Sequence, residues 1–215
     1  MGLLFLRSPL YCVLHSINSC STLADKKSAQ EVRIIGGKWR GRKLRFAGNT
    51  SLRPTLGRTR ETLFNWLRPH LRDFRCLDLF AGSGVLGFEA LSQGASSCVF
   101  IDQNHRTTTT LQACATELDA LDDCQIIKTD APRYLARTET TFDLIFIDPP
   151  FTSPNLLEEA VQLITTRNLC RGFIYLEAAN EAQLTDLTSA LPTVSQKATH
   201  TGDAWASLVE LAHAT

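Results

Sequence analysis

The fold is decided by the stretch Asp78-Leu79-Phe80-Ala81-Gly82-Ser83-Gly84-Val85-Leu86-Gly87. It joins a predicted strand over residues 77–80 to a predicted helix over residues 85–92. Its glycines match the pattern G-x-G-x-x-G in the context that gives the pattern meaning, directly after a strand and at the start of a helix. Because glycine lets the backbone turn tightly and approach a ligand closely, the stretch predicts a loop that binds a nucleotide-like cofactor.

Strands and helices alternate from this loop to the end of the chain. Sequence periodicity predicts further strands over 98–101, 125–127, 144–147 and 173–176, and further helices over 104–118, 131–136, 155–166 and 180–190. Such alternation is typical of an α/β fold, a mostly parallel, doubly wound sheet with helices on both faces. The last two strands, 193–199 and 204–211, are joined through Gly202-Asp203 and predict an antiparallel hairpin on one edge of the sheet. The start of the helix over 104–118 stays open, because threonines at 107–110 are poor helix formers.

A smaller unit precedes the sheet. Residues 32–35 and 43–46 predict two strands with glycines in the turn between them. Pro54 is expected to end extended structure, and an apolar stripe predicts a helix over 58–71. We therefore expect a tail over 1–30, a hairpin and helix over 31–72, and a larger domain over 73–215.

Charge is distributed unevenly along the chain, although lysines and arginines balance aspartates and glutamates overall. Residues 26–60 hold eleven Lys/Arg and one acidic residue, Glu31, whereas residues 61–215 hold ten Lys/Arg and twenty Asp/Glu. A basic arm on an acidic body predicts a polyanionic partner such as nucleic acid. The alternative is a charged hairpin that is simply solvated.

The composition fits a globular protein, with 44% hydrophobic and 20% charged residues. The seven cysteines form no C-x-x-C pair, which indicates a reducing cytosol without disulfides or a zinc site. No stretch approaches the roughly 20 apolar residues that a membrane helix needs. For residues 1–30 we favour a disordered tail or a start codon placed too far upstream, and a transit peptide stays open.

The other informative motif is Asp148-Pro149-Pro150-Phe151, directly after the apolar strand over 144–147. Proline fixes φ and removes backbone donors, which leaves the Asp148 and Pro149 carbonyls free to accept hydrogen bonds. Acceptors beside an aromatic ring suit a flat base that carries an exocyclic amino group. The simpler alternative is a strand that ends in a proline turn.

A glycine loop of this kind fits NAD as readily as S-adenosylmethionine. Asp102 ends the strand after the loop, about 20 residues beyond the glycines, where a carboxylate can hold both ribose hydroxyls. Asp130 ends the following strand, where an adenine edge could be read. Asp78 would repel a pyrophosphate but attract the ammonium of a methionine moiety. Ligands bind at the carboxyl ends of the strands in such sheets, so the loop and the Asp148 motif meet there, which favours S-adenosylmethionine.

The chain resembles the RsmD-type family of small-subunit ribosomal RNA guanine-N2 methyltransferases over about residues 31–211. The resemblance lies in RIIGGKWRGRKL at 33–44, LRPT at 52–55, RTRETLFNWL at 58–67, LDLFAGSG at 77–84 and DPPF at 148–151. It implies a Rossmann-like class I methyltransferase body, S-adenosyl-L-methionine as methyl donor and a guanine N2 as acceptor. It needs no metal. Gly57 departs from the family pattern, in which an acidic residue usually opens the helix.

The resemblance also implies roles for individual residues. The cofactor is expected to be lined by Asp78, Phe80, Ala81, Gly82, Ser83, Gly84, Asp102, Asp130 and Ala131. Phe151 would stack on the extruded base, while Asp148 and the Pro149 carbonyl would accept hydrogen bonds from its amino group. The RNA-binding residues are expected to be Arg33, Lys38, Arg40, Arg42, Lys43, Arg53, Arg58 and Arg60.

The expected partner is small-subunit ribosomal RNA within an assembling 30S particle. The protein itself is expected to be a cytoplasmic monomer that does not contact a membrane. Other amino-group methylases stay open, acting on adenine N6 or on protein glutamine, because all use a related acceptor motif. A non-catalytic RNA-binding assembly factor is an alternative from another class. A nicotinamide oxidoreductase is a more remote one.

Overall fold

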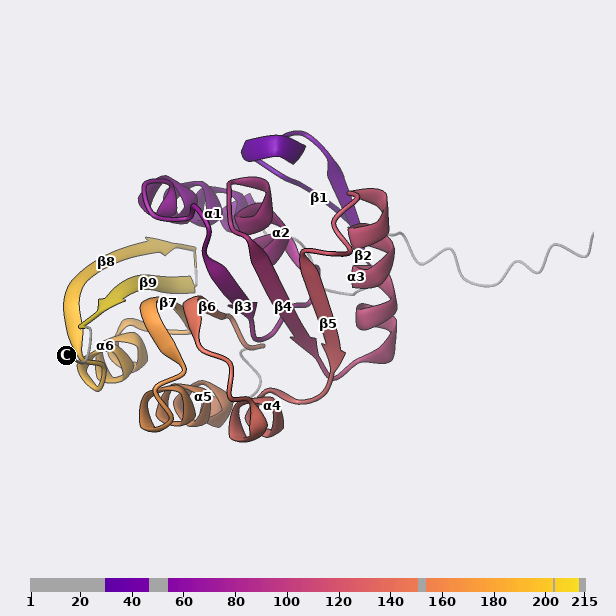
Figure 1. Cartoon of the computed structure of the whole chain (residues 1–215). Coiled ribbons are helices and arrows are strands. Elements are labelled where there is room, and N and C mark those ends of the chain that lie inside the picture. Colours follow the sequence, from indigo (N-terminus) through magenta and orange to yellow (C-terminus); the bar gives the residue numbers. More distant parts are fainter. Residues whose placement is uncertain (1–29, 47–53, 151–153, 203, 213–215) are drawn as a thin grey trace, which may run out of the picture.

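The computed structural model describes residues 30–46, 54–150, 154–202 and 204–212. Within these ranges, seven strands form one sheet in the order β5-β4-β3-β6-β7-β9-β8, and β1 and β2 form a small separate sheet (Figure 1). The strands of the large sheet are β3 (Arg75–Asp78), β4 (Ser97–Asp102), β5 (Cys124–Lys128), β6 (Phe142–Ile147), β7 (Cys170–Ala178), β8 (Thr193–Thr201) and β9 (Ala204–Leu211). The helices are α1 (Pro54–Leu67), α2 (Val85–Ser92), α3 (His105–Glu117), α4 (Ala131–Arg137), α5 (Pro154–Thr166) and α6 (Glu181–Ser189).

The order of the strands confirms the predicted doubly wound sheet. Strands β3 to β7 run parallel, and β9 and β8 close one side of the sheet as an antiparallel hairpin. The chain proceeds from β3 outward to β5 and then returns to β6 on the other side of β3. This reversal makes the carboxyl ends of β3 and β6 the topological switch point, where such sheets bind ligands.

Two layers of helices cover the sheet. Helices α1, α2 and α3 lie over one face, and α4, α5 and α6 lie over the other (Figure 1). Successive strand residues point to opposite faces, so Phe146 and Tyr175 pack in the core under α1 to α3, while Ile147 and Leu176 pack in the core under α4 to α6. None of the helices in these described ranges is long and apolar enough to cross a membrane.

The small sheet pairs β1 (Gln30–Arg33) with β2 (Lys43–Phe46) around a short 3-10 helix, η1 (Gly37–Trp39). Its apolar residues, among them Ile34 and Leu44, join the same core as α2 and α3. Gly37 has a φ of +73°, and a Cβ there would lie 1.7 Å from the carbonyl oxygen of Ser92 in α2. The hairpin is thus pressed against the helix that follows the glycine loop.

Several predicted boundaries were wrong. Helix α1 begins at Pro54 rather than at residue 58. Proline is tolerated there because the backbone N–H that it lacks would have no partner in the first helical turn. The helix ends at Leu67 rather than at residue 71. Strand β1 lies at 30–33 rather than 32–35, and β3 covers 75–78 rather than 77–80. Helix α3 does begin before the threonines, since the Asn104 side chain accepts a hydrogen bond from the Arg106 N–H. The predicted tail, except Gln30, lies outside the described residues.

Candidate active site

The two motifs meet at the carboxyl-terminal edge of the sheet. Asp78 is the last residue of β3 and stands opposite Phe146 of β6, so Asp148 follows two residues further along the neighbouring strand. The two carboxyl groups are close enough for Asp78 to contribute to the raised pKa of Asp148. The glycine loop leaves β3 at this same point.

The glycine loop has the backbone conformation that its sequence predicts. Gly82 and Gly84 have φ angles of +49° and +72°, which side chains rarely allow. A Cβ on Gly84 would also lie 2.4 Å from Leu111 of α3, whereas one on Gly82 would meet nothing closer than 3.8 Å. Gly84 is therefore required by packing, and Gly82 leaves open space in front of the loop.

Asp78 is buried beneath this loop. It is 3% exposed, and its Oδ2 accepts a hydrogen bond of 3.0 Å from the Gly87 N–H. Burial raises the pKa of Asp78 to about 7, against the lowering effect of that hydrogen bond. No ion pair to Asp78 forms among the described residues. A buried carboxyl group without a cation beside a glycine loop fits the ammonium of a ligand.

Two further acidic residues lie at the ends of the neighbouring strands. The Asp102 carboxylate accepts hydrogen bonds from the Gly82 N–H at 3.1 Å and the Asn104 N–H at 2.8 Å, and burial raises its pKa. Asp130 caps α4 through the Arg133 N–H at 2.9 Å and pairs with the Arg133 guanidinium at 3.4 Å. Both carboxylates lie at the carboxyl-terminal edge of the sheet, as predicted, and each accepts hydrogen bonds from nearby backbone N–H groups.

The remaining predicted cofactor residues surround the loop. Ala81 donates its N–H to Ile101 of β4 at 2.9 Å and is buried, and Ala131 is buried at the start of α4. The Ser83 hydroxyl accepts a hydrogen bond of 3.4 Å from the Val85 N–H. Phe80 is half-buried against the core under α4 to α6. The loop thus bridges β3 and β4 over the switch point.

The Asp148 motif lies directly beyond β6. Pro149 is buried, Asp148 is half-buried and Pro150 is exposed. Phe151 lies outside the described residues. Burial, followed by the neighbouring carboxyls of Glu177 and Asp78, raises the pKa of Asp148 well above its ordinary value. Sequence reasoning missed Glu177. The available signal was an acidic residue near the end of the otherwise apolar run Phe173-Ile174-Tyr175-Leu176.

Most of the predicted RNA-binding residues are exposed on the hairpin and α1. Arg40 and Arg58 are exposed, and neither side chain forms a hydrogen bond or ion pair with another described residue. The others are Arg33, Lys38, Arg42 and Lys43, which contact Gly41, Asp123, Glu117 and Glu31 respectively. Arg53 lies outside the described residues. The exposed cations of the hairpin and of α1 are together termed the basic surface.

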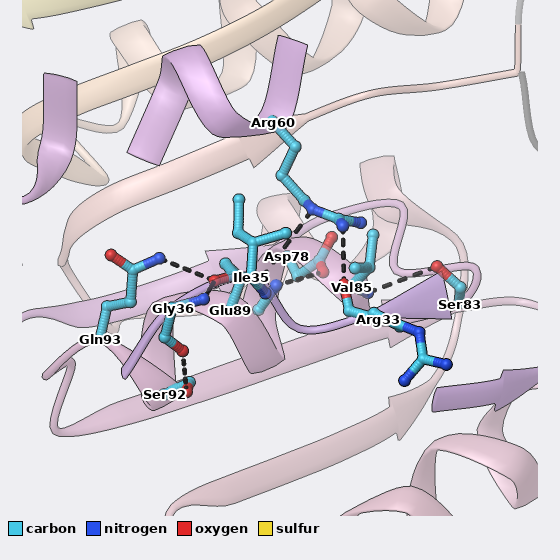
Figure 2. A network of polar contacts seen from close by, with 11 residues as sticks. Arg33, Ile35, Gly36, Arg60, Asp78, Ser83, Val85, Glu89, Ser92 and Gln93 are labelled. Atoms are coloured by element: carbon cyan, nitrogen blue, oxygen red, sulfur yellow. Dashed lines mark hydrogen bonds and ion pairs between the residues drawn. The ribbon is translucent and has the colours of Figure 1, made fainter. Parts of the chain in front are cut away.

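Arg60 is a correction to the predicted RNA-binding set. It is 7% exposed, and its Nη2 donates a hydrogen bond of 2.7 Å to the carbonyl of Arg33. Figure 2 shows its guanidinium pointing into a polar network with Glu89 of α2, whose carboxylate accepts hydrogen bonds from the Ile35 and Gly36 N–H groups. Arg60 therefore joins α1, the hairpin and α2 from inside the protein.

Comparisons with known proteins agree with this geometry. A family model described as "Conserved hypothetical protein 95" matches residues 32–207. Ribosomal RNA small subunit methyltransferase D of Escherichia coli K12 is 40% identical over 166 residues, which cover 76% of this chain and 79% of that protein. The solved structure of yhhF from Escherichia coli is 36% identical with a TM-score of 0.73, and the match covers 86% of this chain and 100% of that one.

A more distant solved structure shares the fold alone. It is the Thermus thermophilus 16S rRNA N2 G1207 methyltransferase RsmC in complex with AdoMet and guanosine. It is 21% identical with a TM-score of 0.64, and the match covers 86% of this chain and 50% of that one.

Proposed function

The chain belongs to the RsmD family of ribosomal RNA small subunit methyltransferases, and from this premise we propose that it methylates the exocyclic N2 of a guanine in small-subunit ribosomal RNA. It is an S-adenosylmethionine-dependent enzyme with a Rossmann-like fold. The observation that carries the proposal is the meeting of the Asp78 loop and the Asp148 motif at one switch point. A cofactor loop and an acceptor motif at one edge place donor and acceptor within reach of each other.

The residues around the loop fit the cofactor. Asp78 is a buried carboxyl group with no cation beside it among the described residues, and the ammonium of the methionine moiety would form an ion pair with it. Asp102 would hold the ribose hydroxyls, and Asp130 would read the adenine edge. Gly82 leaves room for the ligand to approach the backbone. When bound, S-adenosylmethionine supplies an activated methyl group on its sulfonium.

The protein's own contribution to the reaction is mainly placement. The Asp148 carboxyl and the Pro149 carbonyl would accept hydrogen bonds from the N2 amino group, which directs its lone pair toward the methyl carbon. Phe151 would stack on the base. The guanine must leave its stack to reach this site, at a cost of a few kcal/mol. Correct alignment of the reacting atoms can lower the barrier by several kcal/mol.

The basic surface would hold the RNA. Arg40 and Arg58 are exposed on neighbouring elements, and the hairpin that carries Arg40 packs on the helix that follows the cofactor loop. Phosphate contacts of this kind position a nucleic acid without reading its sequence. We also propose that the substrate is a partly assembled 30S particle and that the enzyme is a monomer in the cytoplasm.

The test is transfer of a labelled methyl group to unmodified small-subunit RNA, free or in partly assembled particles. The wild-type protein should label the RNA. Asp148→Ala should label none, while its affinity for the cofactor in calorimetry stays within several-fold of wild type. Wild-type turnover by Asp148→Ala would refute the role of Asp148. A wild-type protein that binds no cofactor would indicate an RNA-binding assembly factor instead.

A further inference from the structure

We propose that Glu177 is a positioning residue that shares a proton with Asp148 and is itself held by the hydroxyl of Tyr175. The inference rests on the proposed function, in which Asp148 receives the amino group of the guanine. It adds to that site a second carboxyl group, which lies behind the first.

The strand register places the two carboxyl groups side by side. Ile147 of β6 stands opposite Leu176 of β7, so the next residues, Asp148 and Glu177, are neighbours across the two parallel strands. Phe146 and Tyr175, two residues before Asp148 and Glu177 respectively, pack in the core under α1 to α3. Because side chains alternate along a strand, Asp148 and Glu177 point toward this same face, and their carboxyl groups are close enough for each to affect the pKa of the other.

A hydrogen bond from Tyr175 fixes the position of the Glu177 carboxyl group. The Tyr175 hydroxyl donates a hydrogen bond of 2.5 Å to Glu177 Oε1. Tyr175 is 1% exposed and Glu177 is 4% exposed, so neither side chain moves freely into solvent. On the other side of β7, Glu177 stands opposite Ala206 of β9, which carries no charge. The polar end of Glu177 therefore has Tyr175 and Asp148 as its bonding partners among the described residues.

The charges around the pair favour one shared proton. Asp78 on β3 is the other acidic group that acts on Asp148. Helix α1 covers this face, but its buried Arg60 is directed toward Glu89. No lysine or arginine of the described residues pairs with Asp148 or Glu177. Glu177 is buried and Asp148 is half-buried, and two adjacent carboxylates without a cation repel each other, so the pair holds a proton between them.

The pKa directions agree with this arrangement. Burial raises the pKa of both groups, and each is affected by the other. The hydrogen bonds from Tyr175 and Asp148 lower the pKa of Glu177, whereas the bond with Glu177 raises that of Asp148. Asp148 is therefore the member with the higher tendency to hold the proton while the site is empty of RNA.

A shared proton gives the pair a role in the transfer step. The N2 lone pair forms the new N–C bond while the S–C bond breaks and its electron pair stays on sulfur. The methylated nitrogen is then positively charged and loses a proton. With the shared proton on Glu177, the Asp148 carboxylate can accept the hydrogen bond before transfer and the excess proton after it. The pair releases that proton to solvent when the product leaves.

The experiment compares Glu177→Gln, Glu177→Leu and wild type by the pH profile of kcat, the KM for RNA and the affinity for the cofactor. Glutamine can still accept from Tyr175 and donate to Asp148, but it cannot share a proton. Glu177→Gln should shift the acid limb of kcat to lower pH by about one unit or more, with KM little changed. The kcat of Glu177→Leu should be lower than that of the wild type by on the order of tenfold or more. At high pH, Glu177→Gln should keep most of the wild-type kcat. An unchanged profile and kcat in both variants would overturn the inference.

A second measurement does not depend on activity. The ¹³C signals of the two side-chain carboxyls, followed by NMR against pH, should titrate in two coupled steps in the wild type. In Glu177→Gln, Asp148 should titrate in a single step at lower pH. Independent single steps in the wild type would contradict proton sharing even if the protein methylated no RNA. Coupled steps in a wild type that transfers no methyl group would refute the proposed function and leave the pair intact.

Discussion

Arg60 Nε lies 3.9 Å from Glu89 Oε2, and both side chains are buried, at 8% and 0% exposed. Glu89 belongs to α2, the helix that begins after the glycine loop, and its carboxylate also accepts the Ile35 and Gly36 N–H groups at 2.9 and 2.8 Å. Burial raises the pKa of Glu89, while these hydrogen bonds and Arg60 lower it. The hairpin, α1 and α2, the helix that follows the glycine loop, are thus joined through one carboxylate.

Glu89→Ala should strongly destabilise the fold, because it leaves Arg60 buried without its acidic partner and removes the acceptor of two backbone donors. We expect the free energy of unfolding to fall by about 3–5 kcal/mol. Urea denaturation of the variant and of Glu158→Ala, an exposed change on α5, measures this difference. A loss for Glu89→Ala no larger than for Glu158→Ala would show that the network does not hold the hairpin.

Arg60 also shows what the sequence could and could not provide. Arg58 and Arg60 are two residues apart on a helix, so they point in nearly opposite directions, and only Arg58 is exposed. The sequence contained that difference, but the partner that buries Arg60 lies 29 residues further along the chain, on another helix. Neither the charge pattern nor the family resemblance distinguished the two residues.

The fold itself was predictable because local signals agreed. The glycine loop, the alternating strands and helices, and the terminal hairpin each indicated the same sheet, and α2 and α4 begin where the sequence indicated. Asp78 and Asp148 could be placed together because parallel strands end at one edge. Glu177 could not be assigned in the same way, because its role depends on the register between β6 and β7.

Reversing charge on the exposed basic surface should weaken RNA binding in a salt-dependent way. In Arg40→Glu/Arg58→Glu, each lost phosphate contact should reduce the slope of log affinity against log salt by about 0.7–0.9. Binding titrations over a range of salt concentrations measure the slope. The matched control is Arg137→Glu/Arg171→Glu, which changes the same charge at exposed positions away from the hairpin. Equal slopes in the two double variants would remove this surface from the RNA interface.

Cofactor binding should release a proton at slightly acidic pH. Asp78 has a pKa of about 7 in the ligand-free protein, and a bound ammonium lowers it by favouring the charged form. Asp78 should therefore release most of a proton at pH 6, and the release should decrease as the pH rises through 7 and beyond. Calorimetry at pH 6 in buffers of different ionisation enthalpy measures this release.

Asp78→Asn should lose the proton release and bind the cofactor more weakly. Asp186→Asn, an exposed change on α6, should behave like the wild type in both respects. Proton release that persists in Asp78→Asn would mean that another group, such as Asp102, holds the ammonium.

The two loop glycines should respond differently to alanine. Gly84→Ala combines a positive φ with contacts of 2.4 Å to Leu111 and 2.8 Å to Phe88, whereas Gly82→Ala carries the positive φ without a close contact. Gly82→Ala should lower the free energy of unfolding by about 1–2 kcal/mol, and Gly84→Ala should lower it further. Thermal unfolding of the ligand-free variants ranks them, and the reverse order would contradict the packing of the loop against α3.

In the proposed function, this site methylates the exocyclic amino group of a guanine. Its most direct test is the chemical identity of the nucleoside formed when the wild-type protein acts on unmodified small-subunit RNA with the methyl donor. Digestion and mass spectrometry should identify N2-methylguanosine at one position, and RNA treated with Asp148→Ala should contain none. Methylation of adenine N6, or no methylated nucleoside at all from a cofactor-bound wild type, would contradict the account.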